Sequence, residues 1–240
     1  MNSKIIYTFL FLLIQTVVCA QDPGNEQVKV GLDALDKGDY VRAIDIFTKE
    51  LKADQSNSDL LFYRGNAYFA NEQFNKALTD FNNAIKVDGA NASLFFNRGN
   101  CYYEMEEYEK AINDMTETVK LKNDFYEAYR VRSSAYFNIE NYKSAISDLS
   151  KIIEFIKDDA SLYYDFGNAL FMSGEYSQAI NQFSDAIKLD NTKADYFFNR
   201  ALSYFYLEIN LEGCADLEDA SKLGDDEALN YYQEFCKDTF

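Results

Sequence analysis

The chain has 240 residues, with 23 basic and 40 acidic side chains, a formal net charge of −17 and no histidine. This acidity disfavours binding to nucleic-acid phosphates or anionic lipid headgroups, which both need clustered Lys and Arg. The absence of histidine excludes Ser-His-Asp triads, imidazole acid–base catalysis and His-based metal sites, and no GxxxxGK[ST] phosphate loop occurs. We therefore expect a protein without enzymatic activity, metal or cofactor.

The first twenty residues predict an export signal that is not part of the fold. Lys4 precedes the apolar stretch Ile5–Val18, and Cys19-Ala20 supplies small residues for cleavage. The apolar stretch is short for a membrane span, which needs about 20 residues. Lipidation of Cys19 is an alternative, although Val18 is a poor residue before a lipid-accepting cysteine. Cleavage after Ala20 would leave 22 basic and 40 acidic residues, a charge of −18, on an exported periplasmic, envelope or secreted protein.

A period of 34 residues organises the rest of the chain. One alanine returns at this interval throughout, at Ala43, Ala77, Ala111, Ala145 and Ala179. Within each repeat the apolar residues recur every three or four positions, the period of an amphipathic helix. Each repeat therefore predicts two antiparallel helices; in the second they cover about Asp59–Ala70 and Phe74–Val87.

We expect a short linker over 21–25 and then a single domain over 26–240. Its repeats cover about 24–57, 58–91, 92–125, 126–159, 160–193 and 194–224, although Gly213 replaces the expected alanine in the last. An acidic helix start at 225–227 follows Gly224, and acids favour a helix N-terminus. The helix over 225–237 would cap the exposed end of the array with Tyr231, Tyr232 and Phe235.

A small residue, Tyr, Ala, Phe and Ala recur in register through several repeats, and in the second repeat they are Gly65, Tyr68, Ala77, Phe81 and Ala84. This pattern resembles the tetratricopeptide repeat (TPR) across about 26–240. The resemblance implies an all-α, right-handed α-solenoid of about six helical hairpins plus a capping helix. It also implies a scaffold that binds a protein or peptide partner, of unspecified identity. The family's proline at the repeat end is absent, and Gln55, Gly89, Asn123, Lys157 and Asn191 stand there instead.

Four repeats carry an Arg thirteen residues before the position of the recurring alanine and an Asp three residues after it; in the last repeat this position is Gly213. The pairs are Arg64 with Asp80, Arg98 with Asp114, Arg132 with Asp148, and Arg200 with Asp216. Where the Arg is missing the Asp is missing too, since Val30 goes with Ile46 and Phe166 with Gln182. We interpret these as structural ion pairs, because an Arg fork satisfies a carboxylate well. The alternative is four arginines that grip an anionic ligand.

The inner face of the predicted solenoid is the expected binding groove. Residues three before, one after and four after the small residue share one helix face, and they form an aromatic trough with amides at intervals: Phe62, Asn66, Phe69, Phe96, Asn100, Tyr103, Arg130, Ser134, Phe137, Tyr164, Asn168, Phe171, Phe198, Leu202 and Phe205. Such a trough suits a peptide. We expect the first ring and the Asn of each trio to be exposed, and the last ring to pack against the next repeat.

The family's clamp for C-terminal carboxylates is matched only in part. Asn66, Asn100 and Arg130 fit it, whereas Phe62 and Ser134 stand where it has basic residues. This argues against a cytosolic chaperone-tail receptor. Two other function classes stay open: a structural subunit of an envelope complex that uses its convex face, and a small-ligand-binding or enzymatic protein.

Three cysteines would remain after export. We predict a disulfide between Cys214 and Cys236 that fastens the capping helix, with two buried thiols as the alternative. Cys101 is expected to be a free core thiol, since free cysteines are usually buried.

Overall fold

The computed structural model describes residues 26–236, which form thirteen α-helices and no strand. The predicted export signal over 1–20, with Cys19, lies outside the described residues. The helices are α2 (Glu26–Asp36), α3 (Tyr40–Glu50), α4 (Ser58–Ala70), α5 (Phe74–Val87), α6 (Ala92–Glu104), α7 (Tyr108–Leu121), α8 (Tyr126–Asn138), α9 (Tyr142–Ile153), α10 (Ala160–Met172), α11 (Tyr176–Leu189), α12 (Ala194–Tyr206), α13 (Asn210–Lys222) and α14 (Asp226–Phe235).

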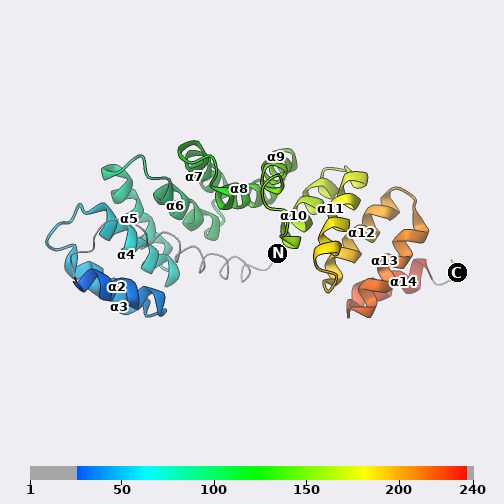
Figure 1. The fold of residues 1–240 in the computed structure, drawn as a ribbon, viewed down its shortest axis with the longest axis horizontal. Helices are drawn as coiled ribbons and strands as arrows, with labels where there is room; N and C mark the ends of the chain where they lie inside the picture. The colour runs from blue at the N-terminus through cyan, green and yellow to red at the C-terminus, as the bar shows by residue number, and fades with distance from the viewer. Residues whose placement is uncertain (1–25, 237–240) are drawn as a thin grey trace. The chain divides into compact units, whose positions relative to one another are not determined.

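The helices pair in chain order as six hairpins, from α2 with α3 to α12 with α13, and α14 packs on α13 (Figure 1). The prediction of an all-α chain of six hairpins and a C-terminal helix is confirmed. In the second hairpin the predicted boundaries differ from the observed ones only at Ser58, which begins α4.

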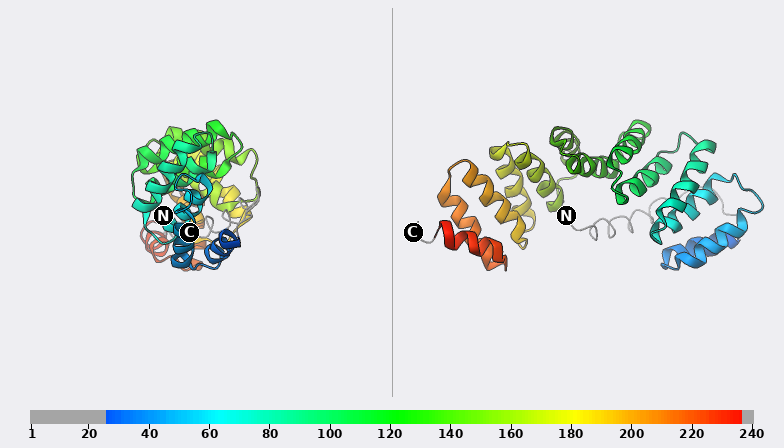
Figure 2. Two further views of the ribbon diagram at one scale, coloured as in Figure 1. Left: turned by 90° about the vertical axis from the view of Figure 1, so that its left-hand side faces the viewer. Right: turned by 180° about the vertical axis from the view of Figure 1, so that it is seen from behind.

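The described chain forms two compact units, 26–122 and 123–236. The first unit contains three hairpins, α2–α7, and the second contains three hairpins and the end helix, α8–α14. Within each unit consecutive hairpins lie side by side, as the views from the front (Figure 1) and from behind (Figure 2) show. The single domain expected over 26–240 stays a prediction.

Small residues let the two helices of a hairpin approach closely, and large rings fill the space beside them. A Cβ added at Gly65 would lie 2.6 Å from Cε1 of Phe81, and one at Gly167 would lie 2.5 Å from Cε1 of Phe183. The alanines of the 34-residue period are completely buried. Both features come directly from the repeat pattern, because close helix packing has no room for larger side chains there.

The turn inside each hairpin places one residue in the left-handed region. Gly38 and Gly174 have φ values of 77° and 86°, and glutamates occupy the same turn position in the other four hairpins, with φ of 57–60°: Glu72, Glu106, Glu140 and Glu208. A side chain in this region costs about 1–2 kcal/mol relative to the right-handed one. The hairpin geometry therefore outweighs a local preference at four turns.

All four Arg–Asp combinations form two-pronged ion pairs between the helices of one hairpin. In the first of them Arg64 donates from Nε and Nη2 to the two oxygens of Asp80, both at 2.7 Å. The other three pairs have N–O distances of 2.7–2.8 Å. The carboxylates are buried and the guanidinium groups mostly so, so each arginine already has an acidic partner within its own hairpin.

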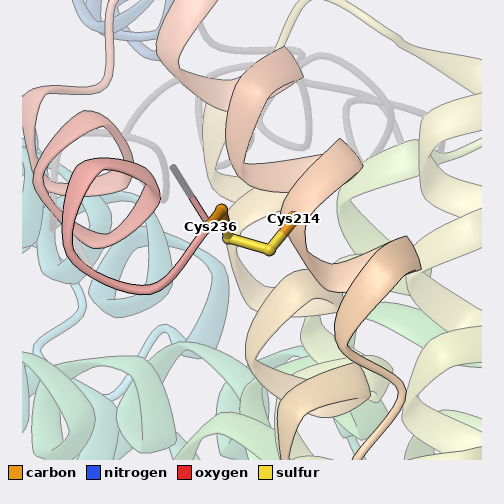
Figure 3. The surroundings of a disulfide bond; sticks show 2 residues. All are labelled: Cys214 and Cys236. Carbon is orange, nitrogen blue, oxygen red and sulfur yellow. A yellow bond between two sulfur atoms is a disulfide. The ribbon is translucent and has the colours of Figure 1, made fainter. Parts of the chain in front are cut away.

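A disulfide fastens the end helix. Cys214 on α13 and Cys236, directly after α14, are joined with their Cα atoms 5.6 Å apart (Figure 3). Ala228 of α14 is buried in the same apolar cluster, and Tyr231 and Tyr232 pack against it.

Cys101 is free and buried, and burial raises the pKa of its thiol, which keeps it unreactive.

Candidate functional site

In the second unit, side chains of α8, α10 and α12 bridge neighbouring hairpins along their first helices. Asn199 of α12 donates from Nδ2 to Tyr164 Oη at 2.8 Å and to Asn168 Oδ1 at 3.2 Å, both on α10. Arg130 of α8 reaches the start of α10. All four side chains are partly exposed. These side chains, together with Asp159 and Asp165, form a surface that we call the inner face of the second unit.

Arg130 is the centre of the first polar group. Its Nη1 donates to Asp159 Oδ2 at 2.8 Å, and its Nη2 donates to Ser161 Oγ at 2.8 Å and Asp165 Oδ2 at 3.4 Å. Asp159 also accepts from the backbone nitrogens of Ser161 and Leu162, so that it caps α10. Arg130 is therefore held by the protein itself, although the sequence suggested that it would hold a partner's carboxylate.

The two carboxyl groups beside Arg130 titrate in opposite directions. Burial opposes ionisation of Asp159, but the hydrogen bond from Ser161 and the charge of Arg130 outweigh it and lower its pKa. Burial raises the pKa of Asp165 to about 6, and the more distant Arg130 only partly offsets this. With one cation and two carboxyl groups, the cluster is net negative near neutral pH and suits a basic group.

Tyr164 is the centre of the second polar group. Its ring lies 4.8 Å from that of Tyr196 and 5.9 Å from that of Phe183. Burial raises the pKa of Tyr164 and, together with nearby Asp190, that of Tyr196 to about 12. Both hydroxyls therefore stay protonated, and the group combines aromatic rings with amides that can bind a peptide backbone.

In the first unit the predicted groove residues differ in exposure. Phe62 and Asn66 are partly exposed as expected, but Phe96 is 5% and Asn100 3% exposed. The expectation that Phe96 and Asn100 are exposed was wrong, because α6 contacts α4, α5 and α7 and has little free surface. The Asn100 amide nitrogen is buried without an acceptor.

The last ring of each trio packs against its own hairpin, and that of Phe171 also packs against Tyr206 of the next hairpin, as expected. The partner within the hairpin is the first aromatic residue of the second helix, at centroid distances of 5.3–5.5 Å: Phe69 with Phe74, Tyr103 with Tyr108, Phe137 with Tyr142, and Phe171 with Tyr176. These rings fix the hairpin tip. In the last hairpin Asn210 replaces the partner, and the ring of Phe205 lies over Gly213 instead.

The remaining predicted positions are partly exposed. Ser134 lies on α8 and Leu202 on α12. The ring of Phe198 packs edge-on against Tyr231 of α14, at 5.7 Å. Within residues 26–236 no three metal-ligating side chains come together, and no helix is long and apolar enough to cross a bilayer.

Sequence reasoning missed several residues that connect neighbouring first helices, namely Asp159, Ser161, Asp165, Tyr196 and Asn199. The spacing of their contacts holds the signal: Arg130 to Asp165 and Tyr164 to Asn199 are both 35 residues apart. For a residue on the first helix of one hairpin, the residue 35 positions later lies on the first helix of the next hairpin, on the side that faces it. Searching at 35 residues as well as at 34 would have found both contacts.

Comparisons with known proteins identify the repeats. The family model described as "TPR repeat" matches residues 65–106 and 167–207, and that described as "Tetratricopeptide repeat" matches 92–125. No curated protein matches the chain.

Several solved structures share the fold. YrrB, described as a TPR protein with an unusual peptide-binding site, has a TM-score of 0.72 at 22% identity, covering 78% of this chain and 97% of its own. The C-terminal part of a TPR repeat-containing protein from Cytophaga hutchinsonii has a TM-score of 0.76 at 18% identity, with 88% and 90% covered. A tetratricopeptide repeat protein from Parabacteroides merdae has a TM-score of 0.69 at 23% identity, with 87% of both chains covered.

The chain thus contains tetratricopeptide repeats, and the predicted all-α TPR solenoid is confirmed. TPR proteins bind protein or peptide partners, so the comparisons support an interaction scaffold.

Proposed function

We propose that this repeat protein is exported to the cell envelope and binds a segment of a partner protein on the inner face of the second unit, without catalysis. The observation that carries the proposal is the partly exposed polar row of Arg130, Asp165, Tyr164, Asn168 and Asn199, fixed by hydrogen bonds between neighbouring first helices. Fixed side chains lose little conformational entropy when a partner binds.

The row offers three kinds of contact to a polypeptide. The amides and the Tyr164 hydroxyl can hydrogen-bond to a peptide backbone, and the rings of Tyr164 and Phe198 can pack against side chains. The carboxylate of Asp165 favours a basic side chain, in keeping with the charge of −17. We therefore expect a partner segment with aromatic or aliphatic side chains and at least one Lys or Arg.

The neighbours support this reading. YrrB is described as having a peptide-binding site, and the TPR fold is typically a non-catalytic scaffold. Asp159 and Asp165 are both held by Arg130, which supports a binding role for these carboxyl groups.

Capture from envelope extract tests the proposal. Purified protein is compared with Asn168→Ala/Asn199→Ala and with the control Asn181→Ala, an exposed residue on α11 of the same repeat. We expect the wild type and the control to capture a partner, and the double variant, still folded by circular dichroism, to lose it. Capture that survives in the double variant would place the partner on the outer face or the ends instead.

The export part of the proposal has its own test. N-terminal sequencing of the protein from an envelope fraction should begin at Gln21. A chain that is recovered intact from the cytosol would contradict export and leave the binding result unaffected.

A further inference from the structure

The tip of the last hairpin carries an exposed apolar cluster. Tyr206 ends α12, Leu207 and Ile209 lie in the turn, and Leu211 is the second residue of α13. Tyr206 and Leu211 are 61% and 56% exposed, and Leu207 and Ile209 are also exposed. We call these four residues the apolar tip. They lie at the hairpin end, apart from the row that binds the partner in the proposed function.

The other five hairpins show that the fold does not require apolar residues there. The equivalents of Ile209 are all polar: Asp39, Gln73, Glu107, Asn141 and Glu175. The equivalents of Leu211 are exposed in every hairpin, and four of the five are polar: Val41, Asn75, Glu109, Lys143 and Ser177. Apolar residues at both of these positions in one hairpin are therefore a departure within a chain that supplies its own comparison.

At the position of Ile209, two of the other five hairpins have a side-chain cap on the second helix, and three do not. Asp39 and Asn141 cap the second helix by accepting from the backbone nitrogens of Arg42 and Ser144, whereas Ile209 makes no side-chain cap at α13. A polar N-cap is worth about 1 kcal/mol. The four apolar side chains remain 36–61% exposed, so burial within this chain uses only part of their apolar surface.

The cluster rests on a rigid base. The Tyr206 ring stacks on Tyr176 of the preceding hairpin, with centroids 4.5 Å apart and planes 12° apart, and lies 5.4 Å from Phe171. Met172, next to Phe171, is 49% exposed. Because these rings are already ordered, a partner that covers Tyr206 need not immobilise it.

The rim of the tip is acidic and contains no base. Glu175, Glu208 and Glu212 are exposed, and none of them pairs with a Lys or Arg in the part of the chain that the structure describes. Residues 170–187 and 201–221 contain no Lys or Arg at all. A second copy of this chain would bring the same negative charges, and anionic lipid would be repelled.

We infer that the apolar tip is a docking site for an amphipathic protein segment whose apolar residues are flanked by Lys or Arg. Its apolar side chains cover Tyr206 and Leu211, and its basic side chains pair with Glu208 and Glu212. Apolar contact supplies the affinity and the charges supply orientation and partner choice.

Fluorescence anisotropy with two synthetic helices tests this inference. One labelled peptide of about 18 residues, or five helical turns, carries leucines along one face and lysines at its borders; the other has glutamate in place of each lysine. We expect the lysine peptide to bind the purified protein at least about tenfold more tightly than the glutamate peptide, and its binding to weaken as salt is added.

Variants with matched controls locate the site. Ile209→Ser/Leu211→Ser should weaken binding of the lysine peptide by about tenfold or more, whereas Val41→Ser, at the Leu211 position of the first hairpin, should not. Glu208→Lys should weaken it as well, and Glu72→Lys, at the same turn position of the second hairpin, should not. Melting curves confirm that each variant is folded.

The variant of the inner face of the second unit separates this inference from the proposed function. Asn168→Ala/Asn199→Ala should leave binding of the lysine peptide unchanged. Equal binding of the two peptides, binding of neither, loss in Val41→Ser as large as in the tip variant, or binding to anionic vesicles in preference to the peptide would each overturn the inference.

Discussion

Arg98 and Asp114 meet face to face between the two helices of one hairpin, with Nε 2.8 Å from Oδ2 and Nη2 2.7 Å from Oδ1. The remaining nitrogen of Arg98 donates to Asn82 Oδ1, on the second helix of the preceding hairpin, at 2.7 Å. One side chain thus joins three helices. Asp114 holds the pKa of Arg98 above its usual value, mainly through their hydrogen bonds and also through its negative charge.

Replacing Arg98 alone should be far more harmful than replacing the pair. Arg98→Phe leaves the buried Asp114 unpaired and should lower the free energy of unfolding by roughly 3–5 kcal/mol. Arg98→Phe/Asp114→Gln copies Phe166 and Gln182 of the fifth hairpin and should recover most of that loss. The recovery should stop short of wild type, because the Gln182 oxygen is buried without a partner. Urea unfolding measures both; a double variant no more stable than the single one would contradict this account.

Gly65→Ala should destabilise the second hairpin. The added methyl would lie 2.6 Å from the completely buried ring of Phe81, and overpacking of this kind costs about 1–3 kcal/mol. Gly89→Ala is the control, since its new methyl would meet only the Ile85 carbonyl oxygen at 3.4 Å. Thermal unfolding should show a lower melting temperature for the first variant and little change for the second. Equal melting temperatures would mean that the ring can move aside.

Removing the disulfide should loosen α14 and leave the preceding hairpins folded. Cys214 and Cys236 are 22 residues apart, and closing a loop of that size contributes about 3 kcal/mol in the chain-entropy view. In Cys214→Ser/Cys236→Ser, amide hydrogen exchange should accelerate over 226–235, while α10 and α11 keep their protection. Reductant should do the same to the wild type and to Cys101→Ala. Unchanged exchange in α14 would show that apolar packing alone holds the helix.

Asp165 should make stability depend on pH between about 4 and 6. Its folded pKa of about 6 lies above the ordinary value of 3.8, so the folded state binds the proton more tightly and loses stability as pH rises through this window. Asp165→Asn should therefore raise the free energy of unfolding by about 3 kcal/mol at pH 7.5, seen as a higher melting temperature, and change it little at pH 4. Melting curves across this range measure it. A variant that is destabilised at pH 7.5 would show that the ionised Asp165 gains more from Arg130 than it loses by burial.

The period of the sequence was sufficient to predict the helices, because each hairpin repeats the same small residues and rings in the same register. It also predicted which arginine faces which aspartate, since Val30 with Ile46 and Phe166 with Gln182 showed the two positions changing together. These features depend on contacts inside one hairpin, where sequence spacing determines proximity.

Features that depend on contacts between hairpins were harder to predict. Arg130 belonged to a plausible clamp by its type and position, but its partners Asp159 and Asp165 lie on the next hairpin. The burial of Phe96 and Asn100 likewise depends on how closely neighbouring first helices pack. Helix periodicity gives the face of a residue but not the distance to the next helix.

The three-helix join at Arg98 has a consequence for how this chain can change in length. Arg98 lies 16 residues after its acceptor Asn82 and 16 before Asp114, and Arg64 stands in the same relation to Thr48 and Asp80. If residues 58–91 were deleted, Thr48 would come to stand 16 residues before Arg98 and could accept its hydrogen bond. Loss of that whole hairpin therefore preserves the join at Arg98, whereas loss of a few residues would break it, so a change of 34 residues is the step in length that keeps this three-helix contact.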